Sequence, residues 1–129
     1  MNRLRLCLGT MITAAVLLLL AGAMAEIRIN EVMASNGVYQ DGHAYDWAEL
    51  YNDGAEVSLA GWYLSNDPYQ PYKWAFPSGA KIAENGYLIV YCAGEGKKPM
   101  TDALCTNFKL SADGDTLYLT SPDGESTVL

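Results

Sequence analysis

The chain has 129 residues, a length that allows one domain with a single two-layer core. It carries fifteen acidic residues against eight basic ones, for a formal charge of −7. A surface this acidic repels phosphate backbones and no basic stripe interrupts it, so nucleic acid is not an expected partner.

The first 25 residues predict a secretory signal peptide. Arg3 and Arg5 supply the positive start, an apolar run follows, and Ala23 and Ala25 have the small side chains that precede a cleavage position after Ala25. We therefore expect a bacterial-type exported protein, either secreted or held at the cell surface. An uncleaved anchor is the alternative, because the apolar run has about the 20 residues that span a bilayer. Only in that case would the chain contact a membrane, through this signal segment.

Cleavage after Ala25 would leave residues 26–129 as one domain. Six basic residues would then stand against all fifteen acidic ones, a formal charge of −9. The chain ends on apolar residues at 126–129, whereas domain boundaries normally fall in polar linkers. We therefore expect a domain that is truncated at its C-terminal end.

Beyond residue 25 the sequence predicts short β-strands and no amphipathic helix, because apolar and polar residues alternate between frequent turn residues. The segment 87–91 is apolar on both faces, which is typical of a strand covered on both sides. Asp113-Gly114 predicts a tight hairpin. The pattern as a whole predicts an all-β sandwich of about seven or eight antiparallel strands after an N-terminal signal helix. The expected strands are 27–33, 45–52, 61–65, 73–76, 87–92, 106–110, 116–120 and 126–129.

Cys92 and Cys105 are the two cysteines beyond the signal segment. In an oxidising compartment they could form a disulfide that closes a loop of about a dozen residues and stabilises the fold by about 3 kcal/mol. A free buried cysteine would instead act as a small hydrophobic residue. Both states are compatible with the sequence.

The residues supply no recognisable catalytic constellation, and we expect no enzymatic activity and no cofactor. Nucleophilic catalysis needs a base beside the nucleophile, and the single histidine, His43, lies in a turn-rich segment without a catalytic motif. Zinc would need three or four histidine or cysteine ligands. Asp113 and Asp115 are weak calcium candidates, because turn carboxylates are oxygen ligands for calcium. The same residues are those that a hairpin turn requires, and we favour the turn.

Several segments in the same order resemble the lamin tail domain family, and together they cover nearly all of residues 26–129. They are Ile-Asn-Glu-Val-Met-Ala-Ser-Asn at 29–36, Asp-Trp-Ala-Glu-Leu-Tyr-Asn at 46–52 with 59–66, Trp-Ala-Phe-Pro-Ser-Gly at 74–79 with Ile82 and 86–90, and the tail segments 107–110 and 114–119. The resemblance implies an immunoglobulin-like β-sandwich that serves recognition or scaffolding. It also implies structural roles for the motif residues Glu31, Asp46, Trp47, Glu49, Asn52 and Trp62.

A glycosidase would need two carboxylates across a cleft. Glu31 and Glu49 are the glutamates that lie inside the expected strands, so they are the pair that could supply them. Glu49 stands between Trp47 and Tyr51 on one strand face. A strand glutamate in that setting is expected to accept hydrogen bonds that hold the sandwich together, and we favour this structural role.

Tyr69, Tyr72 and Tyr39 are the predicted contact residues, and Pro68 and Pro71 stiffen the loop that holds the first two. Rigid loop tyrosines offer a large contact area at low entropic cost, so they could bind a protein or stack on a cell-surface glycan. Alternatively they cap the end of the sandwich. We expect a non-catalytic interaction or scaffolding module. The alternatives are a carbohydrate-binding accessory domain and an N-terminal accessory domain of a larger secreted hydrolase or surface protein.

Overall fold

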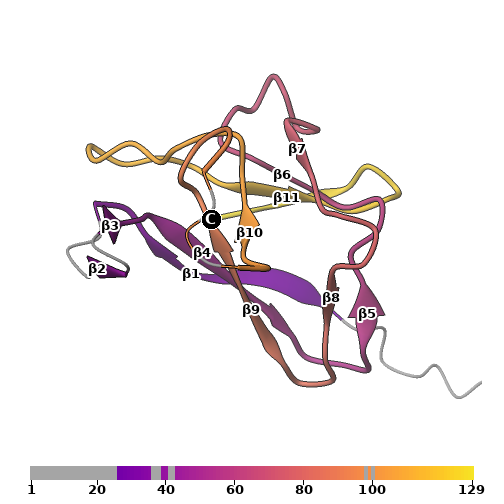
Figure 1. Cartoon of the computed structure of the whole chain (residues 1–129). Coiled ribbons are helices and arrows are strands. Elements are labelled where there is room, and N and C mark those ends of the chain that lie inside the picture. Colours follow the sequence, from indigo (N-terminus) through magenta and orange to yellow (C-terminus); the bar gives the residue numbers. More distant parts are fainter. Residues whose placement is uncertain (1–25, 36–38, 41–42, 98, 100) are drawn as a thin grey trace, which may run out of the picture.

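The computed structural model in Figure 1 describes residues 26–35, 39–40, 43–97, 99 and 101–129. These residues form strands and turns and no helix. Sheet 1 has the order β1-β4-β9-β10, with strands Ile27–Met33, Trp47–Asn52, Tyr87–Tyr91 and Leu104–Cys105. Sheet 2 has the order β12-β11-β6-β7, with strands Ser126–Val128, Tyr118–Thr120, Tyr63–Ser65 and Trp74–Ala75. Two short pairs complete the fold: β2 (Tyr39–Gln40) with β3 (His43–Ala44), and β5 (Val57–Ser58) with β8 (Lys81–Ile82).

Sheets 1 and 2 form a sandwich, and in Figure 1 the strands β6 and β11 lie in one layer above the layer of β1, β4 and β9. The alternation of side chains along each strand supplies the apolar inner faces. From sheet 1 the core receives Leu50 and Val90, and from sheet 2 it receives Leu64 and Leu119, all four fully buried. Removing these side chains from water stabilises the sandwich by roughly 1.5–3 kcal/mol for each.

A β-bulge in β1 sets which residues of that strand face inward. Ile29 and Val32 are three positions apart, so strict alternation would place them on opposite faces. The register shifts between Ile29 and Glu31, after which Val32 lies opposite Ala48 while Ile29 lies opposite Leu50. The extra residue lets both apolar side chains reach the core.

The predicted strand at 106–110 is wrong. The buried Thr106 hydroxyl donates to the Phe108 carbonyl at 2.7 Å, and Lys109 makes only an isolated bridge with Ala93. The strand of this region is instead β10, which pairs in parallel with β9 and so corrects the expectation of an entirely antiparallel sandwich. The expected hairpin at 113–114 is a turn closed by a hydrogen bond from Gly114 N to Ser111 O, without flanking paired strands.

Each of the other predicted ranges contains an observed strand, and most of the observed strands are shorter than predicted. The described residues hold twelve strands in place of the expected seven or eight. The additional strands β2, β3, β5 and β8 have two residues each, too few for an alternation pattern to be recognised in the sequence.

Residues 1–25, with the predicted signal helix and cleavage position, lie outside the described part of the chain. Within the described part, no helix has the length and apolar character needed to cross a membrane.

Candidate functional site

The loop between β6 and β7 is ordered by one aspartate. The Asp67 carboxylate accepts hydrogen bonds from Tyr69 N at 2.9 Å and from the Gln70 side-chain amide at 3.1 Å. The backbone on either side is held as well, because Asp67 N donates to the Ser65 hydroxyl and Gln70 N donates to Asp67 O. An aspartate that bonds the backbone two residues later is a standard way to fix a tight turn. The loop is therefore shaped by its own side chains.

The base of this loop is tied to the segment that precedes β11. Lys73 Nζ donates to Asn66 Oδ1 at 2.8 Å and lies 5.2 Å from the centre of the Phe108 ring. Asn66 Nδ2 in turn donates to Lys109 O and to Asp115 Oδ2. The two hydrogen bonds that Asn66 donates connect residues more than 40 positions apart in the sequence, so they anchor the loop to the sandwich.

The tyrosines of the loop differ in their exposure. Tyr69 has 92% of its surface exposed, the highest value among the exposed large apolar residues. Tyr72 is 58% exposed, and its ring packs edge-on against Tyr63 with 4.9 Å between ring centres. Tyr72 thus combines the two roles that the sequence left open, capping the sheet and facing solvent. Tyr39 belongs to β2 and His43 to β3, but their side chains lie outside the described part of the chain.

The calcium candidates take part in turn hydrogen bonds. The Asp115 carboxylate accepts from Asn66 Nδ2, from Ser111 N and from Thr116 N, at 3.0 to 3.2 Å. The backbone N–H of Asp113 donates a hydrogen bond to the Ser111 hydroxyl at 3.3 Å. Among the described residues, no three His, Cys, Asp or Glu side chains are grouped so that they could hold a metal ion.

The Asn52 side chain is hydrogen-bonded through both its amide nitrogen and its carbonyl oxygen. Its side chain is fully buried at the end of β4, where Nδ2 lies within hydrogen-bond distance of the carbonyls of Ala55, Ile82 and Ala83, and Oδ1 accepts from Gly54 N. These partners lie in the turn after β4 and in the segment of β8. The amide therefore joins the β5–β8 pair to sheet 1.

Other motif residues lie on the strands or at their ends. Glu49 accepts a hydrogen bond from Asn30 Nδ2 at 2.9 Å and lies directly opposite Glu31 in the register of β1 and β4. Trp62 packs against the core, and its backbone connects to Leu59 and Phe76. Trp47 lies opposite Tyr91 and faces outward from sheet 1. The Glu49 contact has the form expected for a structural strand glutamate.

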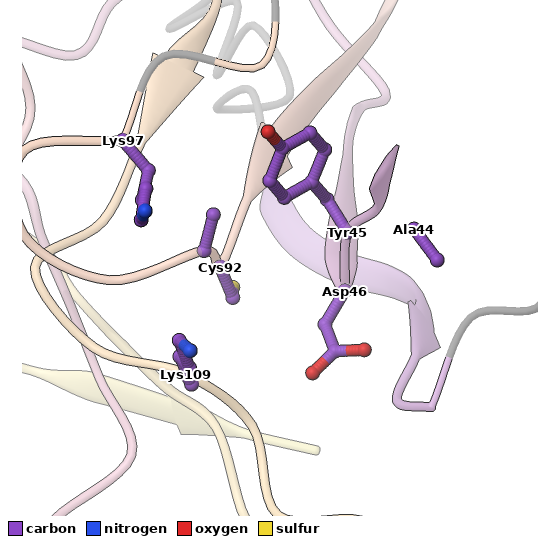
Figure 2. A pocket seen from close by; sticks show the side chains of 7 residues that line it. Ala44, Tyr45, Asp46, Cys92, Lys97 and Lys109 are labelled. Atoms are coloured by element: carbon purple, nitrogen blue, oxygen red, sulfur yellow. The ribbon is translucent and has the colours of Figure 1, made fainter. Parts of the chain in front are cut away.

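A pocket of about 420 Å³ opens beside Cys92 at one end of the sandwich. Figure 2 shows Lys97 and Lys109 on one side of Cys92, and Tyr45 and Asp46 on the other. Burial raises the pKa of the Cys92 thiol from its ordinary value of 9.0 to about 12, so the thiol stays neutral. A neutral thiol is a poor nucleophile, and this cysteine acts as a core residue.

The strand register separates the two cysteines. Cys105 lies opposite Tyr91 in the parallel pairing of β10 with β9, and therefore shares the outward side of Tyr91. Cys92 is the next residue after Tyr91 and points inward to the core. Both cysteines are free thiols in the structure, in agreement with side chains that lie on opposite faces of one sheet.

A comparison with models of protein families found one that matches the residues of the sandwich. The Lamin Tail Domain model matches residues 21–128, which include all the described strands. The chain belongs to the lamin tail domain family. A search of curated proteins found no match. The lamin tail domain is an immunoglobulin-like, non-enzymatic domain that generally takes part in protein interaction, and the resemblance and sandwich predicted from the sequence are confirmed.

Proposed function

We propose that this lamin tail domain is a non-catalytic protein-interaction module of an exported or cell-surface protein, with the β6–β7 loop as its contact surface. The observation that carries the proposal is the combination of a 92% exposed Tyr69 with the hydrogen-bonded turn around Asp67. A large ring on an ordered loop contributes contact area on binding and loses little conformational entropy.

Photo-crosslinking from the loop tests the contact surface. A photoreactive amino acid at position 69 is expected to capture a partner protein in the producing cells, while the same group at Val128, an exposed residue at the opposite edge of sheet 2, does not capture it. With the captured partner purified, Tyr69→Ala is expected to weaken binding about tenfold or more, the effect typical of a central aromatic contact. Equal affinity of Tyr69→Ala and the unsubstituted protein would refute the loop as the contact surface.

Export is supported by the positive start, the apolar run and the small residues before position 26. Expression of the full chain in a bacterial host, followed by N-terminal sequencing of the extracytoplasmic fraction, is expected to give a mature protein that begins at Glu26. A chain retained in the membrane fraction with its original N-terminus would instead identify an anchor. Both the cleaved and the anchored form are compatible with a role as the accessory domain of a larger hydrolase or surface protein.

Carbohydrate binding is the second candidate, and the exposure of Tyr69 and Tyr72 favours it, because the open ring faces could stack on sugars. A glycan array separates the candidates. Retention of a glycan that disappears in Tyr69→Ala and Tyr72→Ala would support the carbohydrate role. A protein partner captured at position 69, with no glycan retained, would support the interaction module.

A further inference from the structure

The outer face of sheet 1 is rich in aromatic residues although no described strand covers it. Residues that are paired across the sheet point to the same side, so the register assigns the members of this face. Tyr87 is 62% exposed and Ile89 is half-buried. The sequence predicts that 87–91 is covered on both sides. The outer side is covered at Tyr91, which is buried and packs edge-on against Tyr45, and it is open at Tyr87. The outer face consists of Arg28, Glu31, Met33, Trp47, Glu49, Tyr51, Tyr87, Ile89, Tyr91 and Cys105.

The rings on this face are already arranged in contact with a cation. Tyr51 and Tyr87 lie opposite each other across β4 and β9, with 4.7 Å between ring centres. The Arg28 guanidinium lies 4.9 Å from the centre of the Tyr51 ring. Cation–ring contacts of this kind are favourable and strengthen when water is excluded. The face therefore has the chemistry to receive a further cation.

Two carboxylates lie side by side in the middle of the face. Glu31 and Glu49 are direct cross-strand partners, and like charges in that position repel each other. Asn30 Nδ2 supplies one neutral hydrogen bond to Glu49. Among the described residues neither glutamate forms an ion pair, and the Arg28 of the same face is paired with Asp53 at 4.0 Å. A cation brought by a partner would relieve the repulsion, whereas a neutral sugar would not.

We propose that the outer face of sheet 1 docks a basic segment of a partner protein, with a lysine or arginine received by Glu31 and Glu49 between the flanking rings. The argument is one of charge complementarity: an aromatic face bearing two adjacent carboxylates, on a domain with a formal charge of −9 beyond residue 25, attracts a cationic chain. The inference goes beyond the proposed function, because this face belongs to sheet 1 and the β6–β7 loop to sheet 2. Either surface can fail without the other.

Binding of a labelled peptide in which arginine alternates with serine tests the proposal. Fluorescence anisotropy with the purified protein is expected to show saturable binding that weakens as salt is added, because ions screen the charges. Glu49→Gln and Glu31→Gln are each expected to weaken binding about tenfold, the cost of losing a charge-assisted hydrogen bond. Tyr87→Ala is expected to weaken it as well.

Matched variants distinguish a site from general attraction. Glu125→Gln removes the same charge from the β11–β12 turn of sheet 2, and Tyr69→Ala alters the loop, so both are expected to bind the peptide normally. Circular dichroism and thermal unfolding verify that each variant is folded. NMR signals of the Trp47 indole and the Ile89 methyl groups should shift with peptide, while the Trp62 indole signal should not.

Three results would overturn the proposal. Equal weakening by Glu125→Gln and Glu49→Gln would show nonspecific charge attraction. Retention of a neutral polysaccharide that is lost in Tyr87→Ala but kept in Glu49→Gln would assign the face to sugars. Concentration-dependent dimerisation abolished by Tyr87→Ala, with no peptide binding, would assign it to a second copy of the chain.

Discussion

Asn52 shows how one side chain can hold three segments in place. Its amide is buried among the carbonyls of Ala55, Ile82 and Ala83, so its replacement leaves buried polar groups without partners. Asn52→Ala is expected to lower the free energy of unfolding by about 2–3 kcal/mol, measured by urea denaturation.

The matched control for this substitution is Asn107→Ala. The Asn107 side chain is exposed and donates a hydrogen bond to Lys73 O at 3.0 Å, so its loss is expected to cost no more than about 1 kcal/mol. Equal losses in the two variants would mean that burial of the Asn52 amide contributes nothing specific.

The Cys92 thiol makes the stability of the domain sensitive to high pH. Burial raises the pKa of Cys92 from 9.0 to about 12, so between these values the unfolded chain loses a proton that the folded chain keeps. The free energy of unfolding should therefore fall with rising pH in this range, by up to about 1.4 kcal/mol for each pH unit from this group. Below pH 9 the thiol is protonated in both states and contributes no pH dependence.

Tyrosines and lysines also titrate at high pH, so the effect of Cys92 is isolated by difference. Denaturation curves of Cys92→Ala measured across the same range are expected to show a shallower loss of stability than those of the unsubstituted protein. Cys105→Ala serves as the control and should keep the steeper loss. Parallel curves for Cys92→Ala and the unsubstituted protein would contradict the prediction.

At the scale of elements, the β8–β9 turn depends on a glycine for space. A Cβ atom added at Gly86 would lie 2.8 Å from the Ala83 carbonyl oxygen, the same oxygen that accepts the Gly86 N–H. Because that oxygen belongs to the backbone, the turn would have to shift. Gly86→Ala is expected to destabilise the domain by about 1–3 kcal/mol and to lower the melting temperature.

Gly79 supplies the control for this substitution, since nothing lies within 4 Å of a Cβ atom added there. Gly79→Ala is expected to leave the melting temperature unchanged or to raise it slightly, because alanine has less conformational freedom in the unfolded chain. A drop as large as that of Gly86→Ala would show that the close approach at Ala83 is unimportant.

The elements also show where local patterns stop being informative. The strong alternation of β4 and the apolar run of β9 predict both strands, because those residues cross the core. At 106–110 the same kind of pattern fails. The Thr106 hydroxyl donates to the Phe108 carbonyl two residues later, and the chain leaves the extended conformation of a paired strand. The choice between these outcomes depends on partners that are distant in the sequence.

At the scale of the whole molecule, β12 closes sheet 2 as an edge strand. It pairs with β11, and two backbone hydrogen bonds between Leu117 and Leu129 extend the pairing. Deletion of residues 126–129 is expected to lower the melting temperature and to promote self-association, because β11 would become an unprotected edge. Scanning calorimetry and analytical ultracentrifugation measure the two effects. Val128→Thr keeps the β-branched shape of an exposed position and should change neither.

The sequence by itself determined the β class of the domain, its order of main strands and its acidity, because alternation, turn residues and charge are local properties. It also singled out Tyr69 and Tyr72 as contact candidates from their position in a proline-stiffened loop. Only the tertiary structure decided that Cys92 and Cys105 lie on opposite faces and that Glu31 meets Glu49. Those relations follow from strand register, a bulge and a parallel pairing, which depend on contacts between distant parts of the chain.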